Sequence, residues 1–285
     1  MKSILVTGGE GQLALCIKDR ISFYDDYKFI FKSSSELDIT NESLVHTVIK
    51  SNSFDYCINC AAYTSVEKAE KEQKTAFEVN GNGPKYLAEA CKLSGTILIH
   101  ISTDYVFDGI NKKKPYIETD IANPINVYGL SKLKGENEIK KSYKKHFILR
   151  TSWLYSEYGN NFLKTMLSLS KKKSEIEVIN DQIGAPTYAG DLADLILKII
   201  ISSSKSYGLY HFSSSGTCSW FDFAVEIFNQ TRASIIVDRI SSADYLSNVK
   251  RPHYGVLDNT KAKSNFNINN KNWRDSLSSM INKLT

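Results

Sequence analysis

The sequence predicts an α/β fold, a doubly wound parallel sheet with a smaller C-terminal lobe. Short apolar runs alternate with helical patterns through the first half of the 285 residues, and such strand–helix units imply parallel strands covered by helices on both faces. A glycine-rich turn follows the first apolar run, at a strand-to-helix junction. The composition is 42% hydrophobic and 24% charged, which provides enough apolar mass for a substantial core.

The first half holds five expected strands separated by helices. The strands are Ser3–Thr7, Tyr27–Phe31, Asp55–Asn59, Thr96–Ser102 and Phe147–Arg150. The helices are Gln12–Ile21, a helix capped by Thr40 or Asn41 that runs to about Lys50, a long helical region broken near Gly81–Pro84, and a helix around Tyr128–Lys141.

In the second half of the sequence, strands and helices alternate less regularly. Strands are expected at Glu175–Asp181 and Gly208–Ser214, and helices at Ala189–Ile201, Trp220–Asn229 and Trp273–Lys283. We therefore expect a dinucleotide-binding domain over residues 1–150. Residues 151–285 should form mainly a substrate-binding lobe, with some elements returning to the first domain.

Charge and cysteine content narrow the class of protein. The net charge of +5 comes from scattered lysines, without the basic stripe or interleaved aromatics of a nucleic-acid groove. No apolar stretch is long enough to span a bilayer, and no signal peptide is visible at the N-terminus. Five cysteines without an export signal favour the reduced cytoplasm. The pattern leaves open whether the chain forms a homodimer.

No metal site is expected. Cys57 and Cys60 form a C-x-x-C in a strand-like run, where residues three apart point to opposite faces, so the two thiols should diverge. We expect both to be buried core residues. The five histidines are isolated in the sequence, and each is expected to serve packing or the surface.

The turn "TGGEGQLA" has the features of a dinucleotide-binding turn. Gly8 and Gly11 allow a tight turn and a close approach of backbone to pyrophosphate, and Ala14 takes the third position of the pattern. The helix that follows offers free N–H groups to phosphates. A glycine pattern alone is weak evidence. Because this one lies at the first strand–helix junction, it predicts a Rossmann-like cofactor site.

The end of the second strand bears on the choice of cofactor. An NAD site would place an acid there to hold the ribose hydroxyls. The sequence has Lys32, Ser33 and Ser34 instead, and no acid appears before Glu36. Lysine and serine can accommodate a 2′-phosphate, so NADPH is favoured and NADH stays open.

Three side chains predict a proton-transfer site. Tyr128 and Lys132 are four residues apart and share one face of a helix, while Thr103 ends the fourth strand at the edge where doubly wound sheets bind ligands. A nearby ammonium should favour the phenolate of Tyr128 and lower its pKa. The pair could then exchange a proton with a carbinol or carbonyl oxygen that Thr103 orients.

The chain resembles the extended short-chain dehydrogenases/reductases, and within them the dTDP-4-dehydrorhamnose reductases. The similarity runs nearly from end to end. It rests on "TGGEGQLA", "ELDIT", "INCAAYTSVEKAE", "VNGNGPKYLAEAC", "HISTDYVFDG", "NPINVYGLSKLKGE", "LRTSWLY", "GNNFLKTML" and "INDQIGAPTY". Of these, "STDYVFDG" and "INDQIGAPT" are the most specific. Departures include Cys60 before "AA", and Tyr254-Gly255 where a small polar residue is usual.

The resemblance implies roles for individual residues. Tyr128 would be the proton donor, Lys132 its activator and a ribose contact, and Thr103 the hydroxyl that orients the oxygen. Cofactor contacts would come from Gly8, Gly11, Gln12, Leu13, Asp38, Ile39, Ala61, Ala62 and Tyr63. Trp153 would shape the sugar pocket.

Further substrate contacts follow from residue chemistry. Asn161, Gln182 and Thr187 are polar groups in loops, and the guanidinium of Arg251 could bind a diphosphate in a bidentate way. A tryptophan in the core, polar turn residues and a surface salt bridge are the alternatives for these positions.

The expected activity is an NAD(P)H-dependent oxidoreduction. The 4-keto group of a nucleotide-linked 6-deoxyhexose would be reduced, from dTDP-4-dehydro-L-rhamnose to dTDP-L-rhamnose, a precursor of cell-surface polysaccharide. Related dehydratases carry Thr-Asp-Glu at the strand end, whereas Tyr105 stands at the glutamate position here. A nucleotide-sugar epimerase and a non-catalytic NADP-binding regulatory subunit remain as alternatives.

Overall fold

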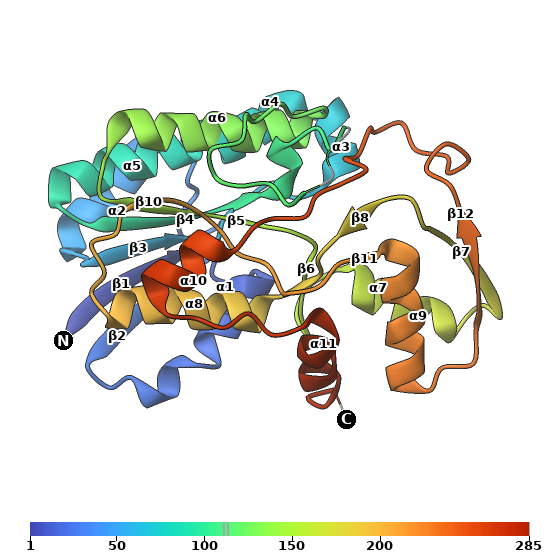
Figure 1. Cartoon of the computed structure of the whole chain (residues 1–285). Coiled ribbons are helices and arrows are strands. Elements are labelled where there is room, and N and C mark those ends of the chain that lie inside the picture. Colours follow the sequence, from blue (N-terminus) through green and yellow to red (C-terminus); the bar gives the residue numbers. More distant parts are fainter. Residues whose placement is uncertain (111, 113, 285) are drawn as a thin grey trace.

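A six-stranded parallel sheet forms the centre of the molecule, in the order β10-β5-β4-β3-β1-β2 (Figure 1). The computed structural model describes residues 1–110, 112 and 114–284. The strands are β1 (Lys2–Thr7), β2 (Tyr27–Lys32), β3 (Tyr56–Asn59), β4 (Ile97–Thr103), β5 (His146–Thr151) and β10 (Gly208–His211). The chain passes from β1 to β2 on one side and returns to β3 on the other, so the topological switch point lies beside β1.

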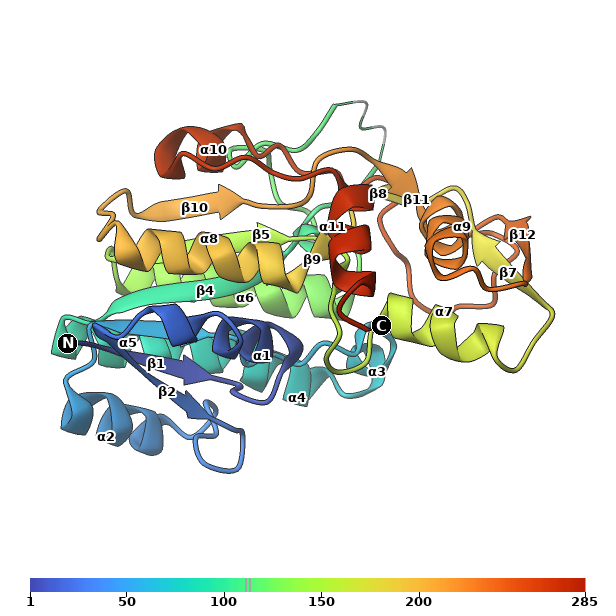
Figure 2. The same cartoon turned by 90° about the horizontal axis from the view of Figure 1, so that it is seen from below.

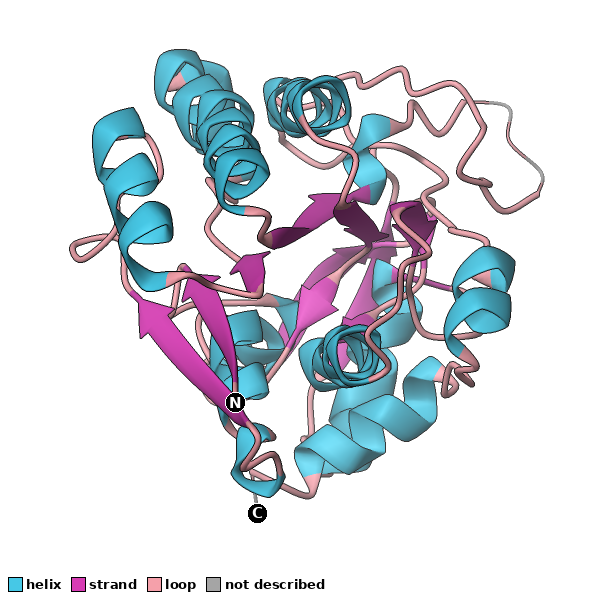
Figure 3. Cartoon of the chain, turned by 90° about the vertical axis from the view of Figure 1, so that its left-hand side faces the viewer, coloured by secondary structure: helices cyan, strands magenta, loops and turns pink. Residues whose placement is uncertain are grey.

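Helices cover both faces of the sheet (Figures 1 and 3). One face carries α2 (Glu42–Asn52), α5 (Gly83–Ser94) and α6 (Val127–Ser142); the other carries α1 (Gln12–Lys18), α8 (Ala189–Ile201) and α10 (Thr260–Phe266). Strand β1 is covered by helices on both faces. Ile4 packs among residues of α1 and α8 on one face, and the next residue, Leu5, packs among residues of α2 and α5 on the other.

The predicted divergence of the two C-x-x-C cysteines is confirmed. Cys57 belongs to the core under α2 and α5, whereas Cys60 lies just past β3 and packs against the core of the opposite face. Cys60 is only partly buried, so the expectation of a buried core residue holds for Cys57 alone. All five cysteines are free.

Two helical predictions need correction. The first helix ends at Lys18 instead of Ile21, and a short 3₁₀ turn, η1 (Ile21–Phe23), follows. The region around Gly81–Pro84 is not a break, because α4 (Gln73–Phe77) continues through a π-helical turn, η2 (Glu78–Asn82), into α5. The glycines serve packing: a Cβ on Gly83 would lie 2.7 Å from Ile39 Cδ1. Pro84 stands in the first turn of α5, where a missing N–H costs nothing.

The elements after Arg150 divide between the sheet and a second cluster (Figure 2). Strand β10 joins the edge of the sheet beside β5, and α8 packs against α1. The cluster contains α7 (Phe162–Ser170), β7 (Glu175–Ile179), α9 (Trp220–Thr231), β12 (Ile236–Ile240) and α11 (Trp273–Ile281). The predicted strands Glu175–Asp181 and Gly208–Ser214 end earlier, at Ile179 and His211, and α7, α10 and β12 went unpredicted.

Short elements connect these layers. They are α3 (Val66–Lys71), η3 (Asp104–Val106), and the paired strands β6 (Leu154–Tyr155) with β9 (Thr187–Tyr188) and β8 (Ile183–Gly184) with β11 (Cys218–Ser219). Within the described ranges, no helix has both the length and the apolar character needed to cross a membrane.

Candidate active site

A cavity of about 740 Å³ lies between the carboxyl edge of the sheet and the second cluster. Its size falls in the range of roughly 300–1,000 Å³ that is usual for small-molecule sites. Many of the predicted site residues line it: Gly11, Gln12, Leu13, Ala61, Ala62, Thr103, Tyr128, Lys132, Trp153, Asn161 and Arg251. Segments far apart in the sequence therefore meet at one edge of the sheet.

The glycine turn forms one wall of this cavity. Gly8 has a left-handed φ of 62°, and a Cβ there would lie 2.7 Å from the backbone nitrogen of Ala61. The N–H of Gly11 donates to the carbonyl of Gly8 at 2.9 Å, which closes the turn directly before α1. Gly8 itself does not line the cavity, because it packs against the backbone at Ala61, but it sets the path of the residues that do.

Close packing of α6 brings Tyr128 and Lys132 to the end of β4. The side chain of Asn126 caps the helix by accepting from the N–H of Gly129 at 2.8 Å. Gly129 has no room for a side chain, because a Cβ there would overlap the carbonyl oxygen of Tyr105. The helix start is thereby pressed against η3, next to Thr103.

Burial has the largest effect on the pKa values of Tyr128 and Lys132. It raises the pKa of Tyr128 to about 12, although the nearby Thr103 hydroxyl opposes the shift. It lowers the pKa of Lys132 to about 8, and the Lys132 ammonium donates to the carbonyl oxygen of Ile101 at 2.6 Å. The predicted lowering of the Tyr128 pKa by Lys132 is thus wrong for the protein alone. At neutral pH the phenol keeps its proton, as a proton donor requires.

Asp104 is a site residue that the sequence analysis missed. It lines the cavity, is only 2% exposed, and accepts a hydrogen bond from the Thr103 hydroxyl at 3.1 Å. Burial raises its pKa to about 7. The signal was present in "STDYVFDG", where the residue directly follows Thr103.

The adenosine end of the expected cofactor site differs from the sequence expectation in one respect. Glu36 folds back to the end of β2, where its carboxylate accepts from the N–H of Ser33 at 2.8 Å and lies 3.3 Å from the Lys32 ammonium. An acid and a lysine therefore share this position. Asp38 and Ile39 lie beyond the cavity: Asp38 accepts from Thr40, and Ile39 is buried against α5.

An aromatic stack forms the wall opposite the sheet. The Trp153 and Trp220 rings lie 3.5 Å apart at 8° to each other, and both line the cavity. Trp153 holds a left-handed φ of 46°, which is unusual for a bulky residue. Gln182 does not line the cavity, but its side-chain oxygen accepts from the indole N–H of Trp220 at 3.2 Å. Trp220 also went unnoticed in the sequence.

The other predicted residues occupy varied positions. Asn161 caps α7 and also donates to Gln12 at 3.3 Å, across the cavity. The Arg251 guanidinium at the rim donates to Glu67 at 2.9 Å. Tyr63 and Thr187 do not line the cavity, since the Tyr63 hydroxyl donates to Glu72 and Thr187 is fully buried beneath the loops.

The residues present fit a bound dinucleotide and its substrate. Thr151, at the end of β5, lines the cavity, and its buried hydroxyl has no hydrogen-bond partner among the described residues. A buried polar atom of this kind calls for a polar group in the cavity. The close approach at Gly8 likewise fixes the path of the turn from which Gly11 and Gln12 line the cavity.

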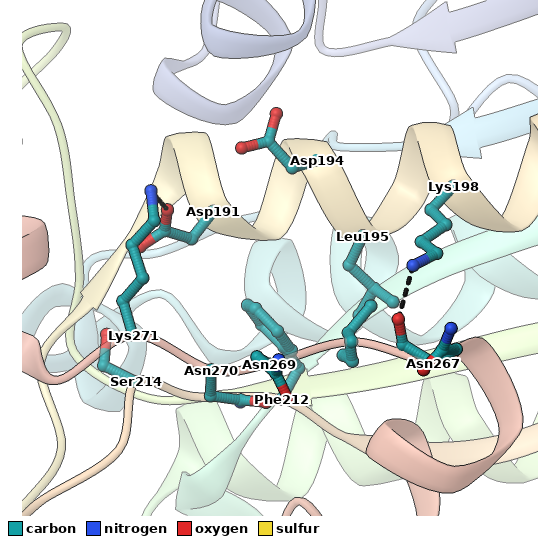
Figure 4. A pocket seen from close by; sticks show the side chains of 11 residues that line it. Asp191, Asp194, Leu195, Lys198, Phe212, Ser214, Asn267, Asn269, Asn270 and Lys271 are labelled. Carbon is teal, nitrogen blue, oxygen red and sulfur yellow. Dashed lines mark hydrogen bonds and ion pairs between the residues drawn. The ribbon is translucent and has the colours of Figure 1, made fainter.

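Two other groupings lie outside this cavity. A cavity of about 200 Å³ between α8 and residues 267–271 is lined by charged side chains, including Asp191 and Lys198, and by apolar ones, including Leu195 and Phe212 (Figure 4). His46, expected to be isolated, instead lies with Glu42 and Glu89, their ligand atoms all within 4.8 Å of one another. Neither grouping contains a predicted site residue.

The fold and the cavity have the arrangement expected for the extended short-chain dehydrogenases/reductases. A glycine turn at the switch point of a doubly wound sheet faces the Thr103, Tyr128 and Lys132 side chains across one cavity. Solved epimerase structures with only 17% identity, such as UDP-glucose 4-epimerase from Brucella ovis (TM-score 0.83), share this fold.

Closer comparisons define the family. The family model described as RmlD substrate binding domain matches residues 1–285, and the chain belongs to this family. A dTDP-4-dehydrorhamnose reductase from Aggregatibacter actinomycetemcomitans is 43% identical, covering 97% of each chain. A crystal structure of this reductase from Bacillus anthracis, in complex with NADP, is 39% identical with a TM-score of 0.95, covering 99% of this chain and 100% of that one. A Clostridium acetobutylicum structure is 40% identical with a TM-score of 0.94, covering 99% of each chain.

Proposed function

We propose that this protein is an NADPH-dependent reductase of a nucleotide-linked 4-keto-6-deoxyhexose, with dTDP-4-dehydro-L-rhamnose as substrate and dTDP-L-rhamnose as product. The observation that carries the proposal is the meeting of Thr103, Tyr128 and Lys132 with the glycine turn at one cavity. Full-length relatives named dTDP-4-dehydrorhamnose reductase, one of them solved with NADP, support the choice of substrate and cofactor.

The chain would divide its work between two regions. Residues 1–150, together with α8, β10 and α10, would hold the dinucleotide on the sheet. The cluster of α7, β7, α9, β12 and α11 would hold the nucleotide sugar. Trp153 and Trp220 would form the apolar wall against the sugar, and Arg251 would exchange its partner Glu67 for the diphosphate.

Tyr128 is the proton donor in this proposal. Its phenol, with a pKa of about 12, stays protonated and transfers the proton to the C4 oxygen of the sugar. Thr103 donates a hydrogen bond to the same oxygen, and Lys132 supplies positive charge that favours the phenolate left behind. NADPH, when bound beside this set, supplies the hydride. The residues of the turn, Gly11, Gln12 and Leu13, would hold its pyrophosphate.

We also infer that the protein works in the cytoplasm, where its cofactor and a nucleotide sugar are available together. Its five free cysteines are compatible with a reducing compartment.

A cofactor-consumption screen tests the proposal. The protein is incubated with NADPH and 4-keto sugars linked to dTDP, GDP, CDP or UDP, and NADPH oxidation is followed. We expect stoichiometric oxidation with the dTDP sugar. Tyr128→Phe should lower that rate on the order of 10²–10⁴-fold while NADPH still binds. Conversion of a sugar without net NADPH oxidation would indicate an epimerase, and unchanged activity of Tyr128→Phe would refute its role.

A further inference from the structure

A buried ion pair lies one helical turn beyond Lys132. Glu136 of α6 is fully buried, and its carboxylate accepts two hydrogen bonds from Arg150 of β5, each of 2.7 Å. The hydroxyl of Ser102 donates to the same carboxylate at 2.6 Å, and Lys140 adds a contact of 3.1 Å from the surface. Two fork-like bonds and a third donor fix this carboxylate in one orientation.

This pair connects the elements that carry the proposed proton-transfer set. Ser102 directly precedes Thr103 at the end of β4, and Glu136 lies four residues after Lys132 on the same face of α6. Arg150 precedes Thr151, which lines the cavity. The guanidinium of Arg150 also donates to His211 of β10 at 3.4 Å, which extends the network to the edge of the sheet.

Lys132 needs a negative charge nearby to remain an ammonium. It is only 2% exposed, and the acceptor of its hydrogen bond, the carbonyl of Ile101, is uncharged. Burial lowers the pKa of Lys132 to about 8, and the carboxylate of Glu136 opposes that shift.

Cys60 and His100 also interact electrostatically with Lys132, and both are neutral near pH 7. Burial raises the pKa of Cys60, beyond the end of β3, and lowers that of His100 on β4, so both stay uncharged. Tyr128, on the same helix, keeps its proton. Glu136 is therefore the anion that acts on Lys132, because Arg150 holds the pKa of its carboxyl below the usual value despite burial.

We propose that Glu136 is a positioning residue that acts through Lys132: clamped by Arg150 and Ser102, it fixes α6 against the ends of β4 and β5 and keeps the Lys132 side chain protonated. The catalytic consequence rests on the proposed function, whereas the protonation of Lys132 does not. Arg150 holds the carboxylate of Glu136 in place. When Glu136 is replaced, the buried charge of Arg150 loses its partner, so a variant that also removes the Arg150 charge is needed.

The test measures the titration of Lys132 in the full-length protein by NMR with ¹⁵N-labelled lysine, using Lys132→Met to identify its resonance. In Glu136→Gln, we expect Lys132 to titrate at least about one pH unit lower, a tenfold loss of proton affinity. In the charge-balanced variant Glu136→Gln/Arg150→Met, the shift should become smaller but remain, because the repulsion from an unpaired Arg150 is gone while the carboxylate that favours the ammonium is still absent. Lys140→Met, which removes only the surface partner, is the matched control and should leave the titration in place.

If Glu136→Gln alone fails to fold, the double variant still tests the proposal, because the double variant leaves no unpaired charge in the core. Wild-type titration of Lys132 in Glu136→Gln would overturn the proposal. Wild-type titration of Lys132 in the double variant would also overturn the proposal, since Glu136 would then do no more than balance the charge of Arg150.

Kinetics provide a second readout. With the dTDP-linked 4-keto sugar, the alkaline limb of the kcat profile should move to lower pH in Glu136→Gln and return only part of the way in the double variant, while KM for NADPH changes less than kcat. A wild-type protein that reduces none of the sugars would refute the proposed function, yet the Lys132 titration would still decide the role of Glu136.

Discussion

At the scale of single residues, Asp104 links folding to pH. Its carboxyl is 2% exposed and has a pKa of about 7 in the folded protein against 3.8 for an unperturbed group. The folded state thus holds this proton more tightly than the unfolded chain does. The stability it contributes is complete below pH 3.8 and is lost as pH rises towards 7, by up to about 4 kcal/mol.

Asp104→Asn removes this titration. We expect the free energy of unfolding of the variant, relative to wild type, to increase by up to about 4 kcal/mol between pH 4 and pH 8. Urea unfolding at a series of pH values measures the difference. A difference that does not change with pH would show that Asp104 ionises as freely in the folded protein as in the unfolded chain.

Lys32 bears on cofactor choice. Its ammonium lies 3.3 Å from the Glu36 carboxylate at the end of β2, where a 2′-phosphate would compete for it. Lys32→Ala should raise KM for NADPH about tenfold and leave KM for NADH nearly unchanged, because one charge-assisted contact is lost. Glu36→Gln should shift the preference the other way. Equal effects on both cofactors would exclude a 2′-phosphate contact at Lys32.

At the scale of elements, the position of α6 depends on Gly129. An alanine there would overlap the carbonyl oxygen of Tyr105, so the helix must move away from η3. We expect Gly129→Ala to destabilise the fold by about 1–3 kcal/mol and to lower kcat roughly 100-fold, since Tyr128 moves with the helix.

Leu130→Ala provides the comparison for this prediction. Leu130 is the next residue of α6 and is exposed, so its loss should change neither quantity much. Thermal unfolding and steady-state kinetics of the two variants give the answer. A Gly129→Ala protein that loses stability but keeps wild-type kcat would break the link between helix position and catalysis.

Sequence periodicity predicted the elements whose patterns are local and strong. The helix Ala189–Ile201 has the predicted bounds, and Asn41 caps α2 as expected. The helix interruption predicted near Gly81 was wrong. The glycines there are needed for close packing against other elements, and a local sequence pattern cannot distinguish such glycines from those that end a helix. Strand β12 escaped prediction because it is mostly exposed and pairs with β7, about sixty residues earlier, so its sequence lacks a buried strand's apolar run.

The site could be predicted in part for the same reason. The sequence itself shows that Thr103 follows an apolar strand and that Tyr128 and Lys132 are four residues apart in a helical pattern. Trp220 and Glu136 did not stand out, because a stacked indole and a buried carboxylate are defined by partners on other elements, here Trp153 and Arg150.

At the scale of the whole molecule, the cavity exists because both halves of the chain contribute to it. Gln12, at the start of α1, accepts from Ser156 at 3.1 Å and from Asn161 at 3.3 Å, so the glycine turn is joined directly to the second cluster. Strand β10 and helix α8 return to the sheet from the second half. The proposed cofactor and sugar sites are therefore parts of one cavity, as direct transfer between two ligands requires.

Transfer of deuterium from NADPH to the sugar tests this account most directly. The protein is incubated with dTDP-4-dehydro-L-rhamnose and NADPH that carries deuterium at both positions of nicotinamide C4, and the product is analysed by NMR and mass spectrometry. We predict dTDP-L-rhamnose with one deuterium at C4 of the sugar, formed in step with cofactor oxidation. A sugar product without deuterium at C4, or no product while both ligands bind, would contradict hydride reduction at this site.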